Sequence, residues 1–230
     1  KGGDAKQTTA LNQPKALPLI DGDGYLYVPD VVSNTCSTPD DSSLDITGDI
    51  TIDIDLTLKN WNDGTERNLV SKYLTSSNQR SYRLFVTTAN RLSFVISSSG
   101  AFESGGSKTP TATISFPDNQ RAQIRVQWRS SDGRVQFFTS TDKGQTFTQL
   151  GTDLYTSGIT SIYNGTADLD IAHRTNVNRI ANSGIHSVQI YDSVTPSSSS
   201  LRFNCDFTAT NVRHGDTKFK CATGQVVTIN

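Results

Sequence analysis

The segment 49–59 shows the clearest alternation of apolar and polar residues in the chain. Its apolar positions are Ile50, Ile52, Ile54, Leu56 and Leu58, and the polar residues Thr51, Asp53, Asp55 and Thr57 lie between them. Successive side chains of a β-strand point to opposite faces, whereas on a helix these residues would surround the axis. The pattern therefore predicts a strand in an antiparallel sheet that is packed on one face only. We expect Asp53 and Asp55 to face solvent.

Shorter segments of the same kind follow along the chain, and no window has helical periodicity. Turn signals separate several of them, including 88–90 and the Ser-Asp-Gly sequence at 131–133. The result is an all-β chain of about a dozen strands. The expected strands are 24–29, 49–59, 68–74, 81–87, 91–97, 111–116, 122–128, 134–139, 146–150, 167–172, 184–191, 201–207 and 225–230.

Residues 1–18 differ from the rest because they lack strand alternation. Pro14 and Pro18 are also incompatible with a regular ladder of hydrogen bonds. We predict an extended N-terminal arm over 1–18 and one large β domain over 19–230. Two interpretations of the arm stay open: a loose terminus, or a segment ordered against a neighbouring subunit.

Composition and charge narrow the functional classes. The 230 residues carry a net charge of −1, which argues against a broad electrostatic grip on nucleic acid or on an anionic membrane. No apolar run approaches the ~20 residues that span a bilayer. Three cysteines, Cys36, Cys205 and Cys221, do not make a disulfide framework. Cys205 and Cys221 could pair across adjacent terminal strands, and buried free thiols are an equally good interpretation.

The sequence Ser140-Thr-Asp-Lys-Gly-Gln-Thr-Phe147 matches the Asp-box pattern. Asp142 can accept hydrogen bonds from backbone N–H groups across the turn, and Gly144 can take a positive φ. Asp boxes recur in sialidases, but those enzymes carry several copies. We therefore interpret this single copy as a structural staple of a hairpin.

Catalytic groups are sparse. Glycoside hydrolysis needs two carboxyl groups that flank the scissile bond, yet the only glutamates are Glu66 and Glu103, both in polar loop contexts. The three histidines, His173, His186 and His214, are scattered, and His186 is in phase with polar strand positions, which predicts an exposed side chain. We expect no enzymatic activity.

Calcium is the one cofactor that the sequence suggests. Asp21 and Asp23 lie one residue apart in Asp-Gly-Asp-Gly, as in a calcium loop, although the further ligands of an EF-hand are missing. Asp-Gly pairs also form ordinary turns before strands. Asp168 and Asp170 make a second pair on one strand face.

Glycan recognition requires exposed aromatic residues near polar groups. Trp61, Phe102 and Tyr163 fit this requirement by their loop contexts, and they are the candidate glycan-binding residues. Each could equally be a packed residue at the end of the fold.

Several segments together resemble laminin-G-like, concanavalin A-like domains found in bacteriophage structural proteins. They are 39–50, Leu-Val-Ser-Lys-Tyr at 69–73, 78–84, 137–151, 165–171 and 223–229. The resemblance covers about 20–230 and implies a jelly-roll β-sandwich of two antiparallel sheets. Ala172 and His173 depart from the pattern, in which small residues are expected. No catalytic residue set is common to these domains, so none is transferred.

The resemblance also implies a function. We expect a non-enzymatic virion component exposed on the particle, such as a capsid decoration, spike or tail protein. Its partners would be other virion proteins or further copies of itself. The alternative is a lectin-like, receptor-binding module that recognises host surface glycans.

Overall fold

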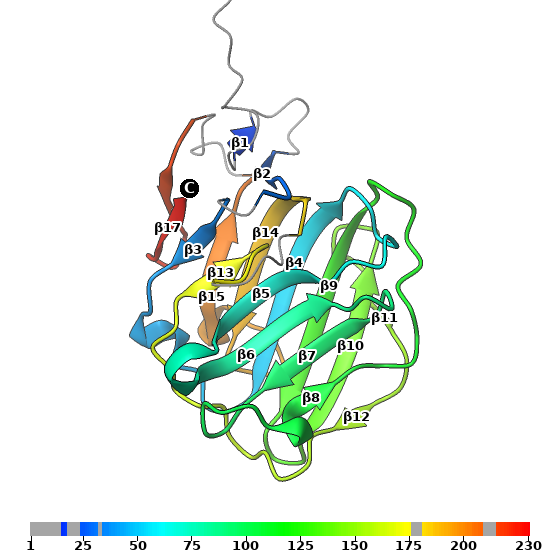
Figure 1. The fold of residues 1–230 in the computed structure, drawn as a ribbon, viewed down its shortest axis with the longest axis vertical. Coiled ribbons are helices and arrows are strands. Elements are labelled where there is room, and N and C mark those ends of the chain that lie inside the picture. The colour runs from blue at the N-terminus through cyan, green and yellow to red at the C-terminus, as the bar shows by residue number, and fades with distance from the viewer. Residues whose placement is uncertain (1–14, 18–23, 32–33, 176–180, 209–214) are drawn as a thin grey trace, which may run out of the picture.

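The chain folds into two antiparallel β-sheets that pack face to face (Figure 1). This computed structural model describes residues 15–17 (backbone only), 24–31, 34–175, 181–208 and 215–230. Within these ranges there is no α-helix, and no helix suited to crossing a membrane. The expected all-β, concanavalin A-like jelly roll is confirmed.

The larger sheet has the order β1-β2-β14-β4-β9-β10-β11, with β15 also paired to β14 and β12 to β10. Its strands are β1 (Lys15–Leu17), β2 (Tyr25–Val28), β4 (Ile50–Leu58), β9 (Arg121–Arg129), β10 (Arg134–Ser140), β11 (Thr148–Gln149), β12 (Leu154–Tyr155), β14 (Ser183–Tyr191) and β15 (Leu201–Asp206).

The smaller sheet has the order β16-β17-β3-β13-β5-β6-β7-β8. Its strands are β3 (Cys36–Thr38), β5 (Arg67–Leu74), β6 (Gln79–Val86), β7 (Leu92–Ile96), β8 (Ser107–Lys108), β13 (Leu169–Ile171), β16 (Lys218–Lys220) and β17 (Val226–Ile229). In Figure 1, β5 to β8 cross in front of β4, β9 and β10. Single 3-10 turns lie at Ser42–Leu44, Ser76–Asn78, Ser104–Gly106 and Ser198–Ser200.

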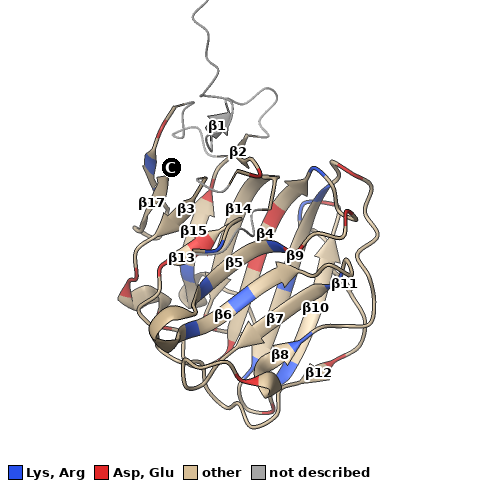
Figure 2. Ribbon diagram, viewed as in Figure 1, with Lys and Arg blue, Asp and Glu red and all other residues tan. Residues whose placement is uncertain are grey.

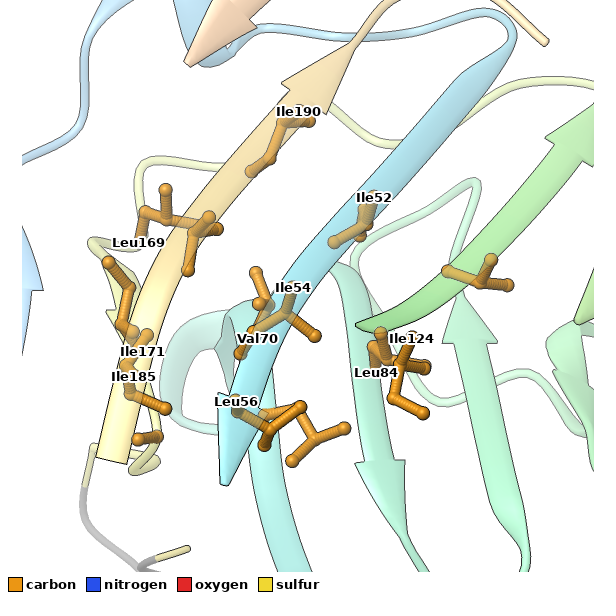
Figure 3. Close-up of a cluster of buried hydrophobic side chains, with 14 of the residues drawn as sticks. Ile52, Ile54, Leu56, Val70, Leu84, Ile124, Leu169, Ile171, Ile185 and Ile190 are labelled. Atoms are coloured by element: carbon orange, nitrogen blue, oxygen red, sulfur yellow. The ribbon is translucent and has the colours of Figure 1, made fainter. Parts of the chain in front are cut away.

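The core fills the space between the two layers. Ile52, Ile54 and Leu56 of β4 are fully buried and point toward Val70 and Leu84 of the opposite sheet (Figure 3). Burial of each such side chain stabilises the fold by about 1.5–3 kcal/mol. The apolar half of the 49–59 pattern therefore lies where the alternation predicts.

The polar half of that pattern is also buried, which corrects the expectation of solvent-facing carboxylates. Asp53 is only 3% exposed and Asp55 is buried as well. In the register of β4 and β9, Asp53 lies opposite Arg125, whose Nε and Nη2 each donate to it at 2.7 Å. Arg121 donates to Asp55 in the same two-point manner, at 2.9 and 2.6 Å. Burial raises the pKa of Asp53, while hydrogen bonding and the charge of Arg125 oppose this shift.

Two further expectations are wrong in detail. The segment 111–116 is not a strand, because Pro110 and Pro117 bracket it and the N–H of Ile114 donates to the carbonyl of Asn90 instead of to a ladder. Lys15–Leu17, assigned to the arm, forms β1 and pairs with β2. The arm positions 1–14 and 18 lie outside the described residues.

The alternative left open for the cysteines is resolved: Cys205 and Cys221 form a disulfide, and Cys36 is a buried free thiol. The bond joins β15 of the larger sheet to the turn between β16 and β17 of the smaller sheet. Hydrogen bonds reinforce this link, since the N–H of Ala222 donates to the Asn204 carbonyl at 3.0 Å.

We predict that the double mutant Cys205→Ser/Cys221→Ser loses about 3 kcal/mol of unfolding free energy, because the disulfide closes a loop with a sequence separation of 16. Urea unfolding at neutral pH measures the loss. Reductant should bring the wild type to the mutant midpoint and leave the mutant unchanged. A wild-type midpoint insensitive to complete reduction would contradict the prediction.

Candidate functional site

Strand β2 presents two tyrosines on the outer face of the larger sheet. In the sequence Tyr-Leu-Tyr-Val, Leu26 and Val28 are buried in the core, so Tyr25 and Tyr27 point outward and are half-buried. They line a groove of about 360 Å³ together with Thr57, Lys59, Asn119, Asn182 and Gly184. We call this site the tyrosine groove.

Three residues of the groove lie at strand ends that backbone hydrogen bonds hold together. The N–H of Lys59, just after β4, donates to the carbonyl of Asn182, just before β14, at 3.2 Å. The N–H of Asn119, near the start of β9, donates to the carbonyl of Leu58 at 3.0 Å. Asn119 and Asn182 have positive φ values of 61° and 45°, which asparagine tolerates better than most residues. Their backbones are therefore held in place, and both asparagines line the groove beside the tyrosines.

Gly184 makes the groove possible because it leaves room for an aromatic ring. A Cβ at this position would lie 2.7 Å from Cδ2 of Tyr25. The ring of Tyr25 thus rests directly on the backbone of β14. The phenol of Tyr27 lies on the other side, where its hydroxyl is 3.4 Å from Oδ1 of Asn182.

Trp61 is buried next to the turn 118–120, which carries the groove residue Asn119. Its side chain is 1% exposed and packs edge to face against Phe116. Its indole N–H donates to the carbonyl of Gln120 at 2.9 Å, and its backbone N–H donates to Asp118 at 3.3 Å. This corrects the prediction of Trp61 as a glycan contact, and the packing alternative is confirmed. Trp61 instead holds the turn that carries Asn119.

His186 is also buried, so the expected exposed histidine is wrong. It is the extra residue of a β-bulge in β14 and is 5% exposed, because the ring of Tyr25 covers it with a centroid distance of 5.6 Å. Nε2 lies 3.1 Å from Oγ1 of Thr57, and Nδ1 lies 3.1 Å from the carbonyl of Gly24. The imidazole thereby joins β14, β4 and the start of β2.

The other two predicted glycan residues share a different region. Phe102 is 63% exposed, in the segment between β7 and β8. Tyr163 is half-buried against Gly100 of that segment, where an added Cβ would lie 2.8 Å from Cε1 of its ring. Phe102 and Tyr163 remain predictions as glycan contacts.

The Asp box is a hairpin staple, as predicted. Oδ1 of Asp142 accepts hydrogen bonds from the Ser140 hydroxyl at 2.6 Å and from the Thr146 N–H at 3.0 Å. The Ser140 hydroxyl, followed by the hydroxyl and N–H of Thr146, lowers the pKa of Asp142 to about 2. The guanidinium of Arg125 lies 3.9 Å from the ring centroid of Phe147, so this hairpin covers the Asp53–Arg125 pair.

Glu66, Glu103 and Asp170 make bonds within the fold. Glu66 pairs with Arg83, and Glu103 accepts hydrogen bonds from three consecutive serines, 97–99. Asp170 borders a smaller cavity of about 160 Å³ that Asp168 also lines. Its two oxygens accept from the N–H and hydroxyl of Thr175, and His173 lies 3.2 Å away.

Metal ligands do not gather within the ranges that the structure describes. No group of three or more His, Cys, Asp or Glu side chains there could hold an ion. Asp21 and Asp23 lie outside the described residues, so calcium at that loop stays a prediction.

Charges of both signs are dispersed over both layers (Figure 2).

The tyrosine groove was not predicted from the sequence. Its one local signal is the spacing of Tyr25 and Tyr27, which places both rings on one strand face. The other contributors come from three distant segments, and only the strand register brings them to β2.

Comparison with known proteins establishes the fold alone. No protein-family model and no curated protein sequence matches the chain. A proposed carbohydrate-binding protein from Bacteroides ovatus has a similar structure, with a TM-score of 0.61 and 11% identity. The match covers 95% of this chain and 58% of that protein, so the chain spans little more than half of its relative. The enzymatically active domain of tailspike protein 2 from bacteriophage CBA120 matches with a TM-score of 0.54 and 9% identity, over 85% of this chain and 32% of that one.

Proposed function

We propose that this protein is a non-enzymatic carbohydrate-binding domain and that the tyrosine groove is its saccharide site. The observation that carries the proposal is the pairing of two outward tyrosines with amide side chains in one groove. A sugar ring has apolar C–H faces and a rim of hydroxyl groups. Aromatic rings fit the faces, and asparagine amides can donate to and accept from the hydroxyls. Small-molecule sites combine apolar walls with a few placed polar groups in this way.

The composition of the groove favours binding over hydrolysis. Glycosidases require two carboxyl groups beside the scissile bond. The described residues that line the groove include none. Asp55, on the same sheet face, is held at both oxygens by Arg121. The similarity to the Bacteroides ovatus protein supports the same function, which is the lectin-like alternative of the sequence analysis.

We predict that Tyr25→Ala and Tyr27→Ala each weaken saccharide binding by about tenfold, because each removes an aromatic contact surface. A glycan array identifies a ligand, and titration calorimetry with that ligand measures the affinity. Tyr155→Ala is the matched control, since Tyr155 is an exposed tyrosine on β12, at the opposite end of the molecule in Figure 1.

Two results would contradict this site. The first is full affinity in both groove variants. The second is loss of binding in Phe102→Ala or Tyr163→Ala instead, which would place the saccharide on the segment between β7 and β8. Absence of any glycan binding by the folded wild type would contradict the proposed function itself.

We predict that Gly184→Ala abolishes measurable binding, because its methyl group displaces the ring of Tyr25. Overpacking of this kind costs about 1–3 kcal/mol of stability, so urea unfolding should accompany the calorimetry. Gly48→Ala is the control, since a Cβ there meets nothing within 4 Å. Unchanged affinity in Gly184→Ala would show that the ligand does not use Tyr25 in its present position.

A second candidate function is that of a bacteriophage virion component, with or without glycan binding. The fold similarity to the tailspike domain favours it, together with the sequence resemblance to phage structural domains. In this function the chain would contact other virion proteins or copies of itself, and the segment 1–18 would serve as a tether.

Mass spectrometry of purified particles from the source tests the virion role. We predict that the chain copurifies with particles and that deletion of residues 1–18 reduces its occupancy on them. Electron cryomicroscopy would then locate it on head or tail. A chain that is absent from clean particles would contradict this second candidate and leave the glycan site untouched.

A further inference from the structure

The tyrosine groove has an uneven charge. Among its described lining residues, Lys59 is basic and none is acidic; the other six are Tyr25, Tyr27, Thr57, Asn119, Asn182 and Gly184. A ligand in the groove therefore meets an ammonium group, hydrogen-bond donors on two amides and no carboxylate from these residues.

Two acidic residues close to the groove in register or in sequence, Asp55 and Asp118, are not among its lining residues. Asp55 lies on the same face of β4, but its carboxylate already holds the guanidinium of Arg121 at two points. Asp118 precedes Asn119, but its carboxylate accepts the backbone N–H of Trp61 at 3.3 Å. Both side chains are thus engaged beside the groove.

Lys59 itself is placed to meet a ligand. Its backbone is fixed by the hydrogen bond to Asn182, while its side chain is exposed and makes no ion pair with the described residues. Because the ammonium group is already in water, pairing it with a ligand anion carries a small desolvation cost.

We infer, on the basis of the glycan-binding function proposed above, that the tyrosine groove prefers acidic saccharides. One sugar face lies on the tyrosine rings, and a carboxylate or sulfate substituent pairs with the ammonium group of Lys59. Neutral sugars bind through the tyrosines and amides alone. An exposed ion pair of this kind changes affinity by about two- to fivefold, and added salt weakens it by screening.

Matched saccharide pairs test this preference. Uronate, sialylated and sulfated oligosaccharides are each titrated beside the neutral counterpart that lacks the acidic group, at low and at high salt. The variants are Lys59→Gln, Lys59→Arg and the control Lys108→Gln, which removes a charge from β8, on the far side of the molecule from β2 in Figure 1.

The wild type and Lys108→Gln should prefer at least one acidic ligand by about two- to fivefold at low salt. Lys59→Gln should bind the acidic and neutral members equally, and Lys59→Arg should keep the preference. The saccharide pair that shows the preference identifies carboxylate or sulfate as the recognised group.

Equal affinity of the wild type for both members of every pair would overturn the inference while glycan binding stands. A preference that survives in Lys59→Gln would overturn it as well, because the acidic group would then be recognised elsewhere. Failure to bind either member of any pair would instead remove the proposed function.

Discussion

Strand β4 lies between β14 and β9 and presents Ile52, Ile54 and Leu56 to the opposite sheet. Burial of this face fixes the register of its neighbours, because a slip by one residue would send the isoleucines to the outer face and the aspartates into the core. The other features depend on that register. It sets Arg125 opposite Asp53 and places Arg121, which lies opposite Thr57, diagonally within reach of Asp55. It also brings the ends of β4, β9 and β14 together beside β2.

The local alternation of the sequence was enough to predict an all-β chain, whereas the jelly-roll sandwich came from the resemblance to known domains. The errors of the alternation have a common cause. Segment 49–59 is a strand, and its apolar residues lie in the core. Its aspartates were placed in solvent because the arginines that cover them come from β9, some 70 positions later in the chain, at sequence separations of 66 and 72. The exposure predicted for His186 was wrong for a related reason, because Gly24, at a sequence separation of 162, and the ring of Tyr25 cover its side chain.

The candidate site was much less predictable than the fold. An aromatic residue in a polar loop, such as Trp61, resembles a ligand contact in sequence. The same residue can instead be buried and stabilise a neighbouring turn by hydrogen bonds. Tyr25 and Tyr27 looked like ordinary strand residues. Their role depends on a glycine and two asparagines from other strand ends, and pairing of those strands is not readable from spacing alone. The role predicted for the Asp box was confirmed, because the hydrogen bonds of Asp142 lie within one hairpin and can be read from local sequence.

The disulfide between Cys205 and Cys221 also determines which strands bear a pulling force applied to the C-terminal segment. A pull on the C-terminal end of this chain first strains β17, which is held by β16 and β3. Only the segment 222–230 can peel away before the tension reaches Cys221. From there the covalent bond passes it to β15 and so to β14, in the middle of the larger sheet. Traction from that end is therefore carried to β15 and β14 of the larger sheet rather than along β16, the edge strand of the smaller sheet.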